Sequence, residues 1–402
     1  MELKIKDKFS QVSNDSGRSY IREILKLLVD PELISFAGGL PSPASFPIKD
    51  ITKICNKILT ENGEVVLQYS TTEGDIGLRE QLSSYLNKQG FCSTKDNFLI
   101  TNGSQQAVDI ISKLFLNKGD KIIVGLPSYL GALNVFKSYY SNTIGVKFDD
   151  KGMRTDKLEE TLKKIYDKGK VVKFIYLIPD FQNPTGLTMP TTRREAILKI
   201  AQKYNCLILE DSPYREIRFS GVQKPTFYSM SPNNNVINLG TFSKILAPGL
   251  RLGWIVANET IVKRSVSLKQ TMDLCTSILL QKITEEYLKN GYFEKNIPII
   301  TSIYKKKLQT MLSCFETYMP KEVSWVVPEG GLFLFLTLPK DFDASEILKT
   351  CIQKYKIAFV PGTVFYCNGK GKNQIRINFS FPSIEQIKMG IKNLANAIKE
   401  KI

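Results

Sequence analysis

A lysine flanked by two hydroxyl side chains is the feature of this sequence best suited to covalent chemistry. Lys244 ends the segment Gly-Thr-Phe-Ser-Lys at residues 240–244, and Arg251 follows one loop later. A lysine amine can form a Schiff base with an aldehyde. The hydroxyls of Thr241 and Ser243 and the guanidinium of Arg251 can bind a phosphate dianion. The segment therefore predicts a site for a phosphorylated aldehyde cofactor.

Two upstream segments place further polar side chains at the ends of predicted strands. The apolar run 174–178 indicates a buried strand and leads to the turn sequence Asn-Pro-Thr-Gly that begins at Asn183. The run 206–209 indicates a second buried strand, and Asp211 lies at its end. Open α/β sheets bind ligands at the carboxyl edge of their strands, where both side chains would lie. A carboxylate there can pair with a protonated pyridine nitrogen.

Each of these segments also has a simpler explanation. Asn183 can belong to an ordinary turn, and Asp211 can cap a helix or a turn. The Gly-Ser-Gln segment at 103–105 opens a predicted helix, whose free N–H groups can bind phosphate, but taken alone a plain serine cap explains it better. The segments of Asn183, Asp211 and Lys244 follow one another in sequence, each at a strand end. That order favours the cofactor site over three separate explanations.

Strands and helices alternate along the middle of the chain, which is the arrangement needed to bring these side chains together. From residue 97 to 257, short apolar runs alternate with amphipathic segments. We expect strands at 98–100, 121–124 and 236–239 and helices at 104–116, 156–166 and 191–204. The alternation predicts an α/β fold, with a large domain at 51–290 whose mostly parallel sheet is covered by helices on both faces.

A smaller α+β domain is expected after the large one, at residues 291–402. Its predicted elements are a helix at 300–318, strands at 332–336, 358–360 and 375–379, and a helix at 383–399. Residues 1–50 are expected to form a separate N-terminal segment.

The chain contains no histidine among its 402 residues. Ser-His-Asp and Cys-His catalysis are thereby excluded, together with most transition-metal sites, so we expect no metal. A general base near neutral pH must then be a lysine, a carboxylate or a tyrosine with a shifted pKa. A Schiff-base lysine satisfies this restriction.

The composition favours a cytoplasmic protein without membrane or nucleic-acid partners. The sequence has no run of about 18 apolar residues, the length of a membrane span, and its start lacks the apolar core of a secretion signal. The seven cysteines are scattered without a Cys-x-x-Cys pair, which favours reduced thiols. The net charge is +16, but the lysines are spread along the chain, so we expect a lysine-rich surface and no nucleic-acid site.

The chain resembles the fold-type I aminotransferases of class I/II, which use pyridoxal 5'-phosphate. Within them it is similar to the branch of 2-aminoadipate, kynurenine and multisubstrate aromatic aminotransferases. Besides the segments above, the resemblance rests on residues 19–24, 35–41, 67–70, 73–74, 101–107, 328–333, 359–362 and 375–377. It implies an aspartate-aminotransferase-like fold in which the N-terminal segment packs with the small domain.

The resemblance assigns the cofactor to side chains from distant parts of the chain. These cofactor residues are Tyr69, Ser104, Gln105, Tyr129, Asn183, Asp211, Tyr214, Thr241, Ser243, Lys244 and Arg251. It implies catalytic roles for Lys244, which carries the cofactor, for Asp211, which holds the ring nitrogen protonated, and for Tyr214, which bonds the phenolic oxygen. Tyr129 would stack on the ring, with a core aromatic as the alternative. Tyr69 would reach the phosphate of the neighbouring subunit, which implies a homodimer with shared active sites.

Four residues are assigned to the substrate by the same resemblance. Arg376 would pair with the α-carboxylate, because a planar guanidinium binds a carboxylate with two hydrogen bonds. Asn183 would share that carboxylate, and Gly39 would let the N-terminal loop approach closely. Arg22 matches a position that contacts acidic side chains in the 2-aminoadipate enzymes. An exposed helix arginine explains Arg22 equally well.

The expected reaction is transfer of an amino group from an L-amino acid to a 2-oxo acid, by a ping-pong mechanism. The expected donor is 2-aminoadipate or an aromatic or branched-chain amino acid, and the acceptor is 2-oxoglutarate. A lyase or decarboxylase of the same fold is an alternative, since the cofactor pocket alone does not fix which bond breaks. A transcriptional regulator is an alternative of another class, because some relatives carry this domain behind a winged helix. Here the similarity starts within the first two dozen residues, so we expect no such module.

Overall fold

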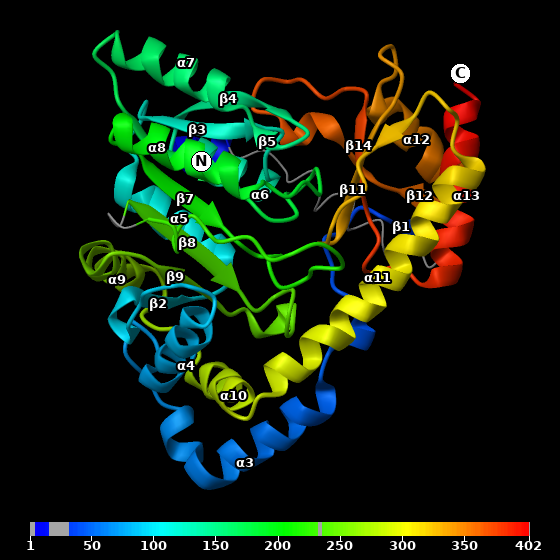
Figure 1. The fold of residues 1–402 in the computed structure, drawn as a ribbon. Helices are drawn as coiled ribbons and strands as arrows, with labels where there is room; N and C mark the ends of the chain where they lie inside the picture. Colours follow the sequence, from blue (N-terminus) through cyan, green and yellow to red (C-terminus); the bar gives the residue numbers. More distant parts are fainter. Residues whose placement is uncertain (1–4, 16–31, 232–234, 402) are drawn as a thin grey trace.

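The computed structural model describes residues 5–15, 32–231 and 235–401, and its largest element is an eight-stranded sheet (Figure 1). The strands lie in the order β2 (Phe98–Thr101), β9 (Gly253–Val256), β8 (Val236–Thr241), β7 (Leu207–Asp211), β6 (Val172–Leu177), β3 (Lys121–Leu126), β4 (Asn142–Asp149) and β5 (Gly152–Met153). Neighbours from β8 to β4 pair in parallel. The β9 strand is antiparallel to β2 and β8, and β5 is antiparallel to β4. The sheet is therefore mixed but mostly parallel.

Helices flank this sheet, as the ribbon in Figure 1 shows. Those that contact it are α4 (Ile76–Asn87), α5 (Ser104–Phe115), α6 (Leu130–Ser138), α7 (Thr155–Tyr166), α8 (Thr191–Lys203) and α9 (Glu259–Asp273). The α10 helix (Ile278–Lys289) packs on α4, and α3 (Ile48–Val66) packs on α10. In α7, the buried side chains Leu158, Leu162 and Ile165 recur at helical spacing. Strands β2 and β8 are buried along their whole length, which a sheet covered on both faces requires. The predicted α/β fold is confirmed.

A second, antiparallel sheet forms the core of the smaller domain. Its strands lie in the order β10 (Ser324–Trp325), β11 (Phe333–Thr337), β14 (Gln374–Asn378) and β13 (Val360–Pro361). The helices of this domain are α11 (Tyr292–Tyr318), α12 (Ala344–Tyr355) and α13 (Ile384–Lys399), and α11 packs along α13 (Figure 1). The α11 helix starts earlier than the predicted residue 300 and contains Pro298.

The N-terminal segment joins this smaller domain through a two-stranded parallel sheet. Strand β1 (Ile34–Ser35) pairs with β12 (Ile357–Ala358). The single strand predicted at 358–360 is therefore two short strands in different sheets, because β12 pairs with β1 and β13 pairs with β14. The remaining short helices are η1 (Ile5–Lys8), α1 (Gln11–Asp15), η3 (Pro43–Ser45), η4 (Lys95–Asn97), η5 (Pro248–Leu250) and η6 (Gly362–Phe365).

The domain boundaries at residues 50 and 290 stay predictions. Within the described ranges, no helix combines the length and the apolar character that crossing a bilayer demands.

Candidate functional site

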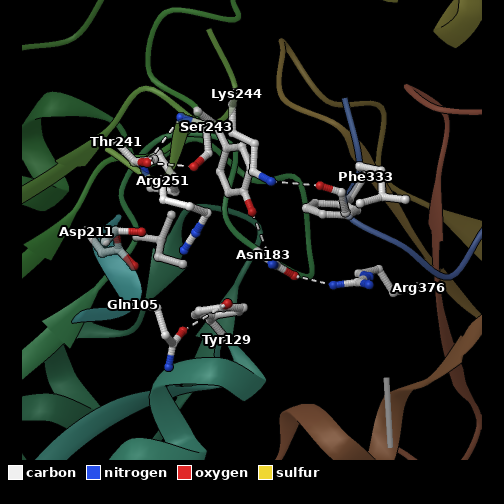
Figure 2. A pocket seen from close by; sticks show the side chains of 16 residues that line it. Gln105, Tyr129, Asn183, Asp211, Thr241, Ser243, Lys244, Arg251, Phe333 and Arg376 are labelled. Carbon is white, nitrogen blue, oxygen red and sulfur yellow. Dashed lines mark hydrogen bonds between the residues drawn. The ribbon is translucent and has the colours of Figure 1, made fainter. Parts of the chain in front are cut away.

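A cavity of about 240 Å³ lies where the carboxyl ends of the large sheet's parallel strands face the small domain (Figure 2). Asp211 ends β7, Thr241 ends β8, and Asn183 and Tyr129 lie in the loops that follow β6 and β3. Its lining residues are Gly39, Leu40, Ser104, Gln105, Tyr129, Ile178, Asn183, Asp211, Pro213, Tyr214, Thr241, Ser243, Lys244, Arg251, Phe333 and Arg376. Parallel strands bring their carboxyl ends to one edge, which explains why such distant segments meet.

Lys244 lies in the turn after β8, and its amine points into the cavity. The Nζ atom donates a hydrogen bond of 2.7 Å to the Gly39 carbonyl oxygen of the N-terminal loop. Burial, with the positive charges of Arg251 and Arg376, lowers the pKa of Lys244 to about 8. Near pH 7 roughly a tenth of the amine is therefore neutral, far more than for an ordinary lysine, and a nucleophile or a base requires that neutral form.

Asp211 has one satisfied and one unsatisfied carboxylate oxygen. Its Oδ2 accepts a 2.7 Å hydrogen bond from the Tyr176 hydroxyl. Its Oδ1 is buried and has no hydrogen-bond partner among the described residues. Burial raises the pKa of Asp211 to about 7. Since a buried acceptor without a donor is costly, this oxygen fits a ligand that presents an N–H group to it.

Arg376 lies on β14 at the small-domain side of the cavity, buried except for 2% of its surface. Its guanidinium donates to Asn183 Oδ1 at 2.9 Å and to the Ala37 carbonyl oxygen at 2.6 Å. The guanidinium also lies 4.3 Å from the ring centre of Phe333, and burial lowers its pKa to about 10. No carboxylate of the described residues pairs with it, since its partners are an amide and a carbonyl oxygen, and Nε has no acceptor there. A buried cation in this state fits an anionic ligand.

The Asn183 amide connects Arg376 with Tyr214. While Oδ1 accepts from Arg376, Nδ2 donates to the Tyr214 hydroxyl at 3.2 Å. The Tyr214 ring packs edge-on against Phe333 with 5.7 Å between centroids. Burial raises the pKa of Tyr214 above its ordinary value, so the hydroxyl keeps its proton near neutral pH and can donate a hydrogen bond.

Backbone and side-chain donors converge at the opposite end of the cavity. Gly103 precedes α5 with a φ of +81°, and a Cβ atom there would lie 2.8 Å from the Arg251 guanidinium. Glycine therefore allows the helix start and the arginine to approach. The first N–H groups of α5 have no partners within the helix. The hydroxyls of Thr241 and Ser243, 3.0 Å apart, lie at the same end. This combination suits a phosphate group.

The structure places most, but not all, of the predicted residues in this cavity. Tyr69 does not line it, and 78% of the Tyr69 surface is exposed. Arg22 lies outside the described residues. Tyr129 lines the cavity, where its hydroxyl lies 3.3 Å from Gln105 Oε1.

The sequence interpretation missed two side chains that hold site residues. Tyr176 bonds Asp211, and Phe333 lies under Arg376. A tyrosine inside an apolar strand was the available signal for the first, because a buried hydroxyl requires a partner. Phe333 ends a segment, 328–333, that carried the resemblance but received no role.

Comparison with known proteins identifies the family. The sequence model of the family "Aminotransferase class I and II" matches residues 34–394. The chain belongs to this family. It is 42% identical to aromatic-amino-acid aminotransferase 1 of Thermococcus litoralis, over 98% of this chain and 94% of the relative.

Solved structures of other aminotransferases have the same fold. Kynurenine aminotransferase of Pyrococcus horikoshii, in complex with PMP, superposes with a TM-score of 0.96 at 42% identity, covering 99% of this chain and 98% of that one. LysN, the alpha-aminoadipate aminotransferase of Thermus thermophilus, complexed with N-(5'-phosphopyridoxyl)-L-leucine, gives 0.92 at 35% identity, covering 99% of both chains. This aminotransferase has the aspartate-aminotransferase-like fold, and its cofactor is pyridoxal phosphate.

The residues present fit this cofactor. The unpaired Asp211 oxygen fits a protonated ring nitrogen, and the start of α5 with Arg251 fits a phosphate ester. Lys244 supplies an amine of lowered pKa. The requirements of the cofactor and the unsatisfied groups of the cavity therefore match.

Proposed function

We propose that this aminotransferase transfers the amino group of 2-aminoadipate or of an aromatic or branched-chain L-amino acid to 2-oxoglutarate, by a ping-pong mechanism. One observation carries the proposal. A single cavity holds the Lys244 amine, whose pKa is lowered, and an unpaired carboxylate oxygen of Asp211. It also holds the Arg376 guanidinium, with which no carboxylate of the described residues pairs. The choice of donors is supported by similarity to relatives named for aromatic amino acids, kynurenine and aminoadipate.

Each side chain has a proposed role that follows from its position. Arg376 binds the substrate α-carboxylate through its planar fork, and Asn183 orients that fork. Asp211 would keep the ring nitrogen protonated through its unpaired Oδ1, while Tyr176 holds Oδ2 in place. Asn183 and Tyr214, which bond each other at 3.2 Å, would hold the phenolic oxygen. When bound, pyridoxal phosphate supplies a ring that accepts the electron pair released at the α-carbon.

Lys244 is the proposed proton carrier. Its amine would accept the α-proton of the substrate at Nζ and hold it for the return transfer. Gly39 O lies 2.7 Å from Nζ and holds the amine toward the N-terminal loop. Gly39 and Leu40 line the cavity beside it, where they would limit access of water.

Replacing Lys244 by alanine tests the covalent part of this proposal. In the wild type, borohydride treatment should leave a pyridoxyl label on Lys244, and glutamate alone should convert the absorbance of the pyridoxal form to that of the pyridoxamine form. In Lys244→Ala, the label should be lost and turnover should fall by about a thousandfold or more. Peptide mass spectrometry and stopped-flow absorbance give the two readouts.

Lys307 is a matched control for this labelling. Burial also lowers the pKa of this second buried lysine to about 8. Lys307 lies on α11, however, and its Nζ donates to the Ser380 carbonyl oxygen at 2.6 Å. A Lys307→Met variant should still carry the label on Lys244. A label that remains in Lys244→Ala, or glutamate that releases carbon dioxide instead of forming the pyridoxamine absorbance, would contradict the proposal.

The donor preference is tested by a screen of amino acids with 2-oxoglutarate as acceptor. Arg22 lies outside the described residues, and its contact with an acidic side chain stays a prediction. The Arg22→Ala variant should lose about tenfold or more in kcat/KM for 2-aminoadipate and little for leucine or phenylalanine, since only the acidic side chain loses a charged partner. An equal loss for all donors would remove this role.

Further predictions concern the assembly and location of the enzyme. A homodimer with shared sites is supported by apolar side chains exposed near the end of α3, Val65, Leu67 and Tyr69. The absence of nucleic-acid and membrane partners and the cytoplasmic location stay predictions.

A further inference from the structure

A partly buried network of polar side chains lies behind the start of α5. Asp273, the last residue of α9, accepts a 2.8 Å bond from Lys269 Nζ through Oδ1. Its Oδ2 accepts from Asn102 Nδ2 and Gln106 Nε2, both at 2.6 Å. The Lys269 side chain is fully buried, and 20% of the Asp273 side chain is exposed. None of these four side chains lines the cofactor cavity.

The network holds both ends of the turn at the proposed phosphate site. Asn102 directly precedes Gly103, and Gln106 lies in the first turn of α5. The Asn102 N–H also donates to Gln106 Oε1 at 2.7 Å, which closes the loop between them. The Asn102 carbonyl oxygen accepts from the Arg251 guanidinium at 3.3 Å. One carboxylate is therefore connected to the helix start and to the arginine.

The backbone after Asp273 adopts an unusual conformation that ends α9 at this residue. Leu274 has a φ of +62° and a ψ of −61°, and the Cys275 N–H donates to the Asp273 carbonyl oxygen at 2.7 Å. A leucine rarely adopts such a tight turn, because its Cβ makes positive φ unfavourable. Strain of this kind persists only where the surrounding structure enforces it, and it clusters near functional sites.

We propose that Asp273, together with Lys269, is a positioning residue that presets the 102–106 turn and Arg251 for the phosphate of the cofactor. The proposal rests on the phosphate role assigned above to this turn and to Arg251. Without the carboxylate, two amides lose their acceptor and Lys269 becomes a buried, unpaired charge. The donors of the turn must then be ordered when the ligand binds, and the cost appears as weaker binding.

The proposal predicts a loss of affinity that is specific to the phosphate ester. Cofactor-free Asp273→Asn is titrated with pyridoxal 5'-phosphate and, separately, with pyridoxal, which lacks the phosphate. The Kd for pyridoxal 5'-phosphate should rise about 10- to 100-fold, the usual effect of losing hydrogen bonds to a charged group. The Kd for pyridoxal should stay within about twofold, because pyridoxal binding depends on Lys244 and the ring contacts.

An exposed ion pair on the same helix is the matched control. Glu259 and Lys263 have the same four-residue spacing as Lys269 and Asp273, but their side chains are 52% and 76% exposed. Glu259→Gln should leave both Kd values unchanged. Competition by inorganic phosphate against pyridoxal 5'-phosphate should weaken in Asp273→Asn and remain unchanged in Glu259→Gln.

A second variant separates positioning from folding. Lys269→Met with Asp273→Leu removes both charges, so stability should recover relative to Asp273→Asn, while the phosphate-specific loss remains. Unfolding in urea measures the first and the two titrations measure the second. An unchanged Kd for pyridoxal 5'-phosphate in both variants, or an equal loss for the two ligands, overturns the inference.

Arg251→Met in the same titrations keeps this inference distinct from the proposed function. If Arg251→Met keeps full affinity for pyridoxal 5'-phosphate, the assignment of the phosphate site is wrong. If Arg251→Met loses affinity while Asp273→Asn does not, the site stands and only the role of Asp273 is wrong.

Discussion

At the scale of single residues, two groups in the cavity have pKa values displaced toward neutrality from opposite directions. Burial raises the pKa of Asp211 to about 7. Burial, together with two nearby arginines, lowers the pKa of Lys244 to about 8. Each charged form has lost water without gaining a partner of opposite charge. A ligand with a protonated ring nitrogen supplies the partner that Asp211 lacks. The free energy stored in these groups therefore favours cofactor binding.

The pH dependence of stability tests the state of Asp211 in the cofactor-free protein. The folded pKa of about 7 lies above the ordinary value of 3.8, so the folded state binds more protons between these pH values. The free energy of unfolding should therefore fall as pH rises from about 4 to 7. Asp211→Asn should flatten this slope and raise the free energy of unfolding at pH 7. Urea unfolding across that range measures both effects.

Asp149 is a control of opposite sign. Its carboxylate pairs with Arg193 at 3.0 Å. Burial alone would raise the pKa of Asp149, but hydrogen bonds from Arg193 and from the Lys151 N–H lower it below the ordinary value. The Asp149 contribution to stability is present above the ordinary pKa and is lost as pH falls through the folded value. Asp149→Asn should therefore lower the free energy of unfolding at pH 7. If Asp211→Asn and the wild type show parallel profiles, the unpaired state of Asp211 is contradicted.

The sequence predicts the site residues that follow strand ends but not those that hold them. Asp211 and Asn183 could be found because turn chemistry and a terminal acid follow apolar runs. Tyr176 was hidden inside such a run. Its contact with Asp211 depends on β6 pairing with β7, and that pairing is not encoded in local spacing.

At the scale of elements, the loop that contains Gly330 and Gly331 and leads into β11 packs around Phe181. A Cβ on Gly330 would lie 2.1 Å from the Ile217 carbonyl oxygen, and Gly331 has a φ of +78°. Both positions therefore require glycine. The Phe181 side chain also packs under the Arg218 guanidinium at 4.8 Å. The loop leads into β11, so these contacts fix where Phe333 lies beneath Arg376.

The boundaries of the long elements follow from periodicity, but the partners of short strands do not. The helix predicted at 191–204 is α8 (Thr191–Lys203), and that at 383–399 is α13 (Ile384–Lys399). The run at 358–360 is apolar throughout, so its pattern could not show that its two halves pair in different sheets. Tertiary contacts alone make that division.

At the scale of the whole molecule, the exposed Tyr69 gives a test of shared active sites. Tyr69→Ala and Lys244→Ala should each be inactive or nearly so, since each would lack one side of the site. After unfolding and refolding as a mixture, hybrid dimers should contain one intact site. Activity should then return to roughly a quarter of the wild-type value, as random pairing of two subunits predicts.

A mixture of Lys244→Ala and Asp211→Ala is the control for this experiment. Both residues line the cavity of a single chain, so no hybrid dimer contains an intact site. That mixture should stay inactive. Size-exclusion chromatography checks that dimers form in the Tyr69→Ala and Lys244→Ala mixture. If the dimers form but the activity does not return, Tyr69 does not act in the neighbouring site.

The pairing of β1 with β12 also has a consequence for biosynthesis. Ile34 pairs with Ile357, so β1 cannot pair until β12, more than 300 residues later in the chain, has been synthesised. At about 5–20 residues per second, Ile357 leaves the ribosome roughly 15 to 60 seconds after Ile34. The nascent polypeptide can finish its large sheet in that interval, while the loop that carries Gly39 to the Lys244 amine remains undocked. Catalytic competence therefore arises only once translation is nearly complete.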